Sequence, residues 1–107
     1  MNSKIEELKE LIIEDPLDPF LHYVLALEYE KANEEALAVA TLIELMNIRP
    51  DYLALYYQLG RILQVEGRSE EAIAVLKKGL DLAQSLKNRH TFSEISSLLS
   101  EIMEDDE

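Results

Sequence analysis

Apolar side chains recur along most of this chain at intervals of three and four residues. That spacing places them on one side of an α-helix, so the pattern predicts an all-α fold of six helices without β-strands. The expected helices cover residues 3–15, 18–32, 33–48, 51–66, 69–86 and 90–104. Residues that favour helix starts stand near the head of these segments, at Ser3, Asp18, Asn33, Asp51, Ser69 and Thr91. Gly67 is expected to end the fourth helix, because glycine readily adopts the left-handed conformation found after many helices.

The same pattern repeats after 34 residues. Leu8, Leu42 and Leu76 stand at this interval, and Pro16 and Pro50 share it. Further identical pairs at this interval are Leu21 and Leu55, Tyr23 and Tyr57, Leu25 and Leu59, Ala38 and Ala72, and Ala40 and Ala74. A period of this length is typical of helix–turn–helix units that stack into a solenoid, where each unit buries its apolar face against its neighbours.

The repeated residues resemble the pattern of the tetratricopeptide repeat (TPR) family. In that pattern a leucine with a small residue, followed by a large apolar residue, occupies the first helix of a repeat. An alanine and a large apolar residue occupy the second helix. The resemblance is carried by Leu25, Ala26, Tyr29, Ala38, Leu42 and Pro50 in one repeat and by Leu59, Gly60, Leu63, Ala72 and Leu76 in the next. It covers nearly the whole chain and is similar in kind to small stand-alone bacterial proteins of the family.

Some positions depart from the family pattern. His22 and Tyr56 stand where the family often has tryptophan, Gln84 replaces the closing proline of the second repeat, and Asn33 stands where Gly67 provides the later turn. The repeat positions themselves are packing positions, so the leucines are expected in the core. Small residues are expected where helices approach closely; these are Ala26, Gly60, Ala38, Ala72 and Gly79.

We expect a single TPR-like domain over residues 1–107. Repeat 1 covers residues 16–49 and repeat 2 covers residues 50–86. Two repeats alone would leave an apolar face at each end. The helix at 3–15 is therefore expected to act as an N-terminal half repeat, and the helix at 90–104 as a C-terminal capping helix.

Composition narrows the class of protein. The chain has 107 residues, no cysteine and a net charge of −12, from 22 acidic and 10 basic residues. This charge disfavours nucleic acid and anionic membranes as partners, and it favours partners with basic residues. The alternative is that the acidic residues only keep the protein soluble. The acidic end, Glu104 to Glu107, is expected to be a frayed tail. Without a signal-peptide or membrane-spanning pattern, a cytoplasmic location is expected.

Several side chains on the first helix of each repeat are not used by the core pattern. They are Phe20, Tyr23, Leu27 and Glu30 in repeat 1 and Ala54, Tyr57, Arg61 and Gln64 in repeat 2. Their spacing places each set on one helix face. In the TPR family this face lines the concave groove that holds peptides, so the resemblance implies a partner-binding groove. Tyr23, Tyr57 and Arg61 are the expected anchors. The alternative is that the tyrosines pack along neighbouring helices and that Arg61 pairs with a local glutamate.

The resemblance implies a protein-interaction module, an adaptor or scaffold for a peptide or protein segment. The alternative is a self-associating structural protein, a homodimer formed through an apolar stripe near Phe92 and Met103 without a peptide ligand. One subtype of the family clamps the C-terminal carboxylate of heat-shock chaperones with lysines and asparagines. The corresponding face here carries Tyr23, Tyr57 and Arg61 instead, so a chaperone-tail adaptor is not expected.

The sequence predicts neither an enzyme nor a cofactor or metal site. It has only two histidines. His22 is expected to be a packing residue, because it shares a repeat position with Tyr56. His90 and Glu94 are one helical turn apart, but two ligands make a weak metal site. The three glycines are isolated, so there is no glycine-rich phosphate loop.

Overall fold

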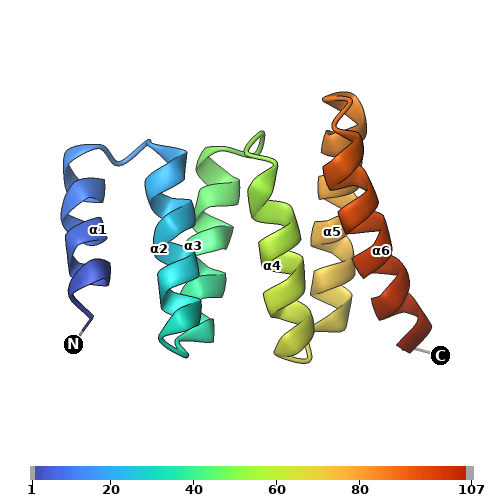
Figure 1. Ribbon diagram of the computed structural model, residues 1–107, viewed down its shortest axis with the longest axis horizontal. Helices are drawn as coiled ribbons and strands as arrows, with labels where there is room; N and C mark the ends of the chain where they lie inside the picture. Colours follow the sequence, from blue (N-terminus) through green and yellow to red (C-terminus); the bar gives the residue numbers. More distant parts are fainter. Residues whose placement is uncertain (1, 106–107) are drawn as a thin grey trace. The chain divides into compact units, whose positions relative to one another are not determined.

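The structure is a computed structural model that describes residues 2–105 (Figure 1). The chain divides into two compact units. One ends at Tyr52 and contains α1 (Ser3–Glu14), α2 (Pro19–Lys31) and α3 (Glu35–Ile48). The other begins at Leu53 and contains α4 (Ala54–Val65), α5 (Ser69–Ser85) and α6 (Arg89–Asp105). The described part of the chain contains no strand, so the predicted all-α class is confirmed. The organisation as a single domain stays a prediction.

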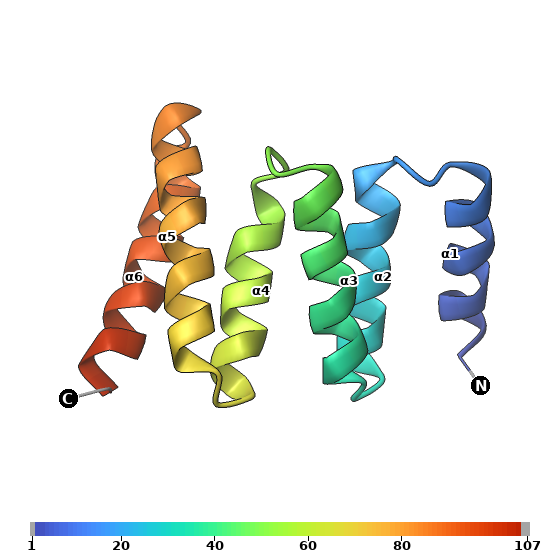
Figure 2. The same cartoon turned by 180° about the vertical axis from the view of Figure 1, so that it is seen from behind.

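Within each unit, consecutive helices run in opposite directions and pack side by side (Figures 1 and 2). In the first unit α2 contacts both α1 and α3, and in the second α5 contacts both α4 and α6. The helix ends lie within one residue of the predicted ends. Helix ends are fixed by the apolar pattern together with the turns that follow, and both are visible in the sequence.

The cores of the two units are built from the repeat positions. Buried apolar side chains of the first unit are Ile5, Leu8, Leu25, Ala26, Tyr29, Ala38, Val39, Leu42 and Leu45. Those of the second are Leu55, Tyr56, Leu59, Ile62, Leu63, Ala72, Val75, Leu76, Ala83, Ile95, Leu98, Leu99 and Ile102. The prediction that Leu25, Leu42, Leu59, Leu63 and Leu76 lie in the core is therefore confirmed, whereas Leu21 is half-buried. Burying each large side chain of this kind contributes about 1.5–3 kcal/mol.

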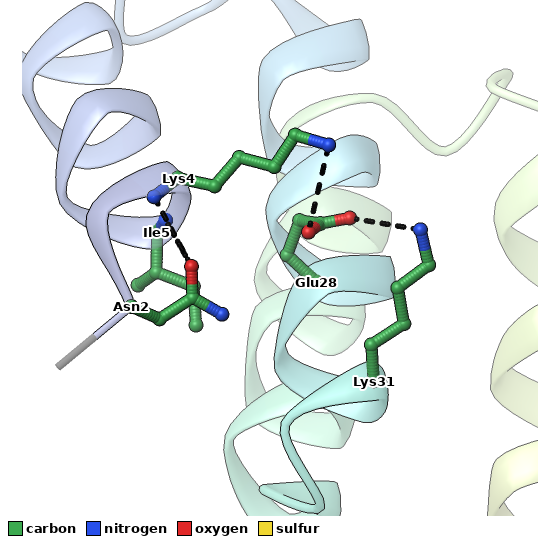
Figure 3. Close-up of polar contacts among 5 residues, drawn as sticks. All are labelled: Asn2, Lys4, Ile5, Glu28 and Lys31. Atoms are coloured by element: carbon green, nitrogen blue, oxygen red, sulfur yellow. Dashed lines mark hydrogen bonds and ion pairs between the residues drawn. The ribbon is translucent and has the colours of Figure 1, made fainter.

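Among the described residues of the first unit, two polar side chains are buried, and both have partners. The Nε2 of His22 lies 2.7 Å from the carbonyl oxygen of Pro16, so the ring can donate to it. Glu28 is only 7% exposed, and its carboxylate lies 4.0 Å from Nζ of Lys4 and 3.2 Å from Nζ of Lys31 (Figure 3). The ion pair with Lys4 joins α1 to α2, while that with Lys31 stays within α2. Because removing one partner of a buried charge is costly, Glu28 helps fix the position of α1 on α2.

The beginning of α1 differs from the prediction. The Oδ1 of Asn2 accepts hydrogen bonds from the backbone N–H groups of Lys4, at 3.1 Å, and Ile5, at 3.3 Å. Asn2 is therefore the N-cap, and the prediction that Ser3 caps this helix is wrong. Both residue types cap helices well, so the sequence alone did not distinguish two neighbouring candidates.

The beginnings of α4 and α6 also differ. α4 begins at Ala54 and not at Asp51, whose carboxylate is hydrogen-bonded to the Arg49 side chain at 3.1 Å. Thr91 lies inside α6, and its N–H is donated to Oδ1 of Asn88 at 3.0 Å. At α4 the side chain expected to open the helix is bound to a nearer partner, and at α6 the side chain of Asn88, three residues before Thr91, accepts the backbone N–H that a cap would accept.

Three helices of the described chain end in the same way. Asn33, Gly67 and Lys87 follow α2, α4 and α5 with φ values of 61°, 76° and 58°. Each donates its N–H to the carbonyl three residues earlier, and the next residue donates to the carbonyl five residues earlier, at distances from 2.8 to 3.1 Å. This is the Schellman motif. The prediction that Asn33 caps the following helix is wrong, because Asn33 ends α2, and Glu34 is the N-cap position of α3.

Replacing Lys87 with glycine is expected to stabilise the protein by about 0.5–1 kcal/mol. A left-handed φ costs a residue with a Cβ about 1–2 kcal/mol, and glycine avoids this cost. The net gain is smaller, because glycine loses more backbone entropy on folding. Urea unfolding at 25 °C measures the change. Asn33→Gly is the matched control and should give a smaller gain, because asparagine already tolerates this conformation. If Lys87→Gly lowered the stability, the left-handed conformation assigned to Lys87 would be contradicted.

Candidate functional site

The residues proposed from repeat 1 lie along α2 in the first unit. The start of α2 is fixed by Asp18, whose Oδ1 accepts the Phe20 N–H at 3.0 Å, and by Pro19 in the first turn. The predicted cap at Asp18 is thus confirmed. Phe20 is 59% exposed, and the other three members of the set, Tyr23, Leu27 and Glu30, are half-buried. The set therefore presents aromatic and apolar surface to solvent along one helix.

Tyr23 is paired with a residue that the repeat pattern did not indicate. Its ring centroid lies 5.6 Å from that of Tyr52, with the rings tilted by 56°. Burial raises the pKa of the Tyr52 hydroxyl, and the nearby Tyr23 and Asp18 raise it further. Like any tyrosine, Tyr52 is protonated at neutral pH and its hydroxyl can donate a hydrogen bond; the raised pKa extends this state to more alkaline pH. Tyr52 lies in the connection between α3 and α4, although the sequence predicted a helix over 51–66, and no spacing rule links it to Tyr23.

The residues proposed from repeat 2 lie along α4 in the second unit. Ala54 is exposed, whereas Tyr57, Arg61 and Gln64 are half-buried. The guanidinium of Arg61 donates two hydrogen bonds to Oε1 of Gln58, at 3.2 Å from Nε and 2.6 Å from Nη2. This contact orients Arg61 along α4. An arginine held in this way loses less side-chain entropy when it binds a ligand.

Tyr57 lines a recess of about 320 Å³ between α4 and α6. The other residues that line it are Glu94, Ser97, Leu98 and Glu101, all from α6. The recess therefore combines an aromatic ring, an apolar side chain and two carboxylates. None of the α6 residues was proposed from the sequence, although Glu94, Ser97 and Glu101 follow at spacings of three and four. Sequence spacing alone did not connect them with Tyr57, because α6 was interpreted as a capping helix or as a surface for self-association.

The structure thus defines two local surfaces, one in each unit. Tyr23 and Tyr52 mark the first, and Tyr57 with the α6 carboxylates marks the second. That the two sets line one groove stays a prediction.

Two exposed ion pairs lie beside turns. Arg49 lowers the pKa of Asp51, and Arg68 lowers the pKa of Glu71, in each case mainly through a side-chain hydrogen bond. Any stability from these pairs is present above the ordinary carboxyl pKa and is lost as the pH falls through the lowered value. Exposed ion pairs of this kind contribute little to the free energy of unfolding.

Ser69 is the first residue of α5 and not its cap. The N-cap position is Arg68, whose side chain binds Glu71.

Two properties of the described chain bear on the class of site. Over residues 2–105, no helix has both the length and the apolar character needed to cross a membrane. The same residues contain no group of three or more histidine, cysteine or acidic side chains placed to hold a metal ion. His90 and Glu94 do lie near each other, at 3.6 Å, but both side chains are exposed.

Comparisons with known proteins agree with the repeat pattern. The family model described as tetratricopeptide repeat matches residues 53–86. A tetratricopeptide repeat domain protein from Salinibacter ruber, solved by NMR, is 32% identical, with a TM-score of 0.78 over 82% of this chain and 89% of that one. Its crystal structure gives 30% identity and a TM-score of 0.77 over 80% and 97% of the two chains. No curated protein matches the chain in sequence.

More distant structures share the fold. The chaperone SycD of Yersinia enterocolitica, in complex with a peptide of the translocator YopD, has a TM-score of 0.85 at 18% identity over 98% of this chain and 84% of that one. The TPR2B domain of yeast Sti1, in its complex with pHsp70, has a TM-score of 0.87 at 16% identity over 94% and 81%. The helical pairs, the core positions and these likenesses define an α-solenoid of helix–turn–helix repeats. The chain belongs to the tetratricopeptide repeat family.

Proposed function

We propose that this protein is an adaptor that binds a segment of a partner protein on the first-helix faces of its repeats. The observation that carries this proposal is the recess at Tyr57, where a half-buried aromatic ring lies beside Leu98 and two carboxylates. Such a ring can bury against a ligand side chain, as interface anchors do. The peptide complex of SycD and the pHsp70 complex of Sti1 support the proposal, because both are formed on the same fold. The proposal includes no catalytic step.

The charge around Tyr57 supports a basic ligand at this point. Glu94 and Glu101 line the recess, and the net charge of the chain is −12. A lysine or arginine of the partner could place its aliphatic stem on Tyr57 and its cation between the carboxylates. Arg61, also on α4, would accept an acidic ligand group instead. The ligand is therefore proposed to carry basic residues flanking its anchor, and its capture should weaken as salt concentration rises.

Tyr57→Ala is expected to weaken partner binding by about 2 kcal/mol or more, roughly 30-fold in Kd, because aromatic anchors carry this much. Arg61→Glu should weaken it further if the ligand is acidic at that point. Partners captured from the native cell extract would be identified, and the affinity of each variant for the purified partner measured. Thermal unfolding should be nearly unchanged.

Two controls make this test specific. Tyr57→Phe keeps the ring and removes only the hydroxyl, so it should retain most of the affinity. Leu37→Ala, at an exposed position of α3 outside the proposed faces, should leave the affinity unchanged. A partner that binds the double variant of Tyr57 and Arg61 as tightly as the parent would place the interface elsewhere.

Self-association is the second candidate function, and Met103, which is 48% exposed on α6, favours it. Self-association through Met103 would leave the recess at Tyr57 open to a peptide ligand, because Met103 does not line that recess.

A further inference from the structure

The two ends of α6 carry charges of the wrong sign for their own helix. Arg89 is its first residue and Lys87 lies in the turn between α5 and α6, and among the described residues neither forms an ion pair. Glu101 and Glu104 stand near its end, and the sequence remains acidic to Glu107. A helix has a partial positive charge at its N-terminus and a partial negative charge at its C-terminus. Both ends of α6 are therefore electrostatically unfavourable in the isolated chain, and a partner with the opposite arrangement would relieve both.

The beginning of α6 also offers a hollow for an apolar side chain. This hollow, of about 480 Å³, lies at the corner between α5 and α6. Ala83 and Phe92 line it together with the cationic Lys87 and Arg89. At the other end of the helix, Met103 is 48% exposed. One end of α6 thus presents a cationic hollow, and the other presents a protruding apolar side chain beside acidic residues.

A single stripe of α6 connects these two ends. Arg89, Phe92, Ser96, Ser100 and Met103 follow at spacings of three and four, which places them on one side of the helix. A shallow hollow of about 370 Å³ lies along Ser96, Ser97 and Ser100 in the middle. Small side chains there would allow a second helix to approach closely.

We propose that two copies of this chain associate through their α6 helices, packed antiparallel. With Arg89 of one copy opposite Glu104 of the other, the two-fold axis passes between positions 96 and 97, where the serines lie. Met103 of each copy then comes within about one turn of Phe92 of the other, so its thioether can contact the ring in the cationic hollow. The helix dipoles of the two copies are opposed, which stabilises both ends of both helices.

A second copy fits this surface better than an unrelated acidic segment. The cationic hollow and its complement lie on the same helix, so one symmetric pairing forms both contacts twice. A foreign peptide would use one hollow and leave the acidic end of α6 unchanged. The surface shares Ser97 and Glu101 with the recess at Tyr57, but Tyr57 itself lies outside it.

Charge reversal with complementation tests the proposal. The parent protein is expected to dimerise with a Kd of about 10–100 µM in sedimentation velocity, because a single pair of helices buries a small area. Arg89→Glu alone and Glu104→Arg alone should each weaken the dimer at least tenfold. An equimolar mixture of the two variants should restore a heterodimer, because one of its two contacts is the parental Arg89–Glu104 pair and the other is the same pair with both charges reversed. Lys9→Glu makes the same charge change in the first unit and should leave the dimer unchanged.

The outcomes are distinct. If the parent protein remained monomeric at about 1 mM, the proposal would be overturned, because a dimer with a Kd above that concentration would not be a specific interface. The antiparallel pairing would be overturned if the single variants dimerised like the parent. It would also be overturned if the mixture stayed monomeric while both variants kept the circular dichroism spectrum and melting temperature of the parent. Tyr57→Ala should keep the dimer intact, so failure of the peptide-binding proposal and failure of this one are measured separately.

Discussion

Replacing Gly79 with alanine is expected to destabilise the protein by about 2–3 kcal/mol, the cost of overpacking a well-filled core. A Cβ at this position would lie 2.5 Å from Cβ of Tyr56 and 3.0 Å from Cδ1 of Ile95. The Cβ of Tyr56 is attached directly to the backbone of α4, so it cannot rotate away. Either α4 or α5 must move, and the buried side chains between them would lose contacts. Urea unfolding at 25 °C measures the change.

Two other glycines provide the controls. At Gly60 the three atoms nearest to a new Cβ all belong to the side chain of Leu76, which can shift in part, so Gly60→Ala should cost less than Gly79→Ala. At Gly67 no atom lies within 4 Å of a new Cβ, but φ is 76°, so the cost comes only from the backbone and should be about 1 kcal/mol. If Gly79→Ala proved no more harmful than Gly67→Ala, the close contact between α5 and its neighbours would be contradicted.

Ending the chain after Leu86 is expected to cause aggregation or to remove more than about 5 kcal/mol of stability, which is comparable with the total stability of a small domain. The removed helix α6 contributes four buried apolar side chains: Ile95, Leu98, Leu99 and Ile102. Its loss would expose the part of α5 around Gly79 and Ala83 to water. Size-exclusion chromatography and urea unfolding would detect the effect.

A shorter truncation separates the packing role of α6 from its acidic end. A chain that ends at Ile102 keeps all four buried side chains and should retain nearly the stability of the parent. If the chain that ends at Leu86 were also monomeric and equally stable, α6 would not be a capping helix, and the segment from Phe92 to Met103 would become a candidate for direct partner binding.

The fold was predictable because the core positions repeat. A leucine such as Leu42 has an equivalent at Leu76, so each repeat confirms the assignment of the other. The helix starts were less predictable, because capping depends on competition between neighbouring polar side chains. Asn2 displaced Ser3, and Asp51 bound Arg49 instead of capping a helix. Such choices depend on local geometry that spacing does not encode.

The candidate site was predictable only where it follows helix periodicity. The spacing rule identified Tyr23 and Tyr57, which lie on single helices. It could not identify Tyr52, whose contact with Tyr23 depends on the path of the chain after α3. It also missed Glu94 and Glu101, because their contribution to the recess at Tyr57 depends on how α6 packs against α4. Contacts between elements require the tertiary structure, whereas contacts along one helix do not.

The left-handed turns bear on how a chain of this kind can change its length during evolution. Asn33 and Gly67 are 34 residues apart and close their helices with the same hydrogen bonds. A duplicated 34-residue block would therefore join the existing chain through the same left-handed turn that already closes α2 and α4. Lengthening by gene duplication would need no new loop, and only the residues on the newly joined helix faces would have to adapt.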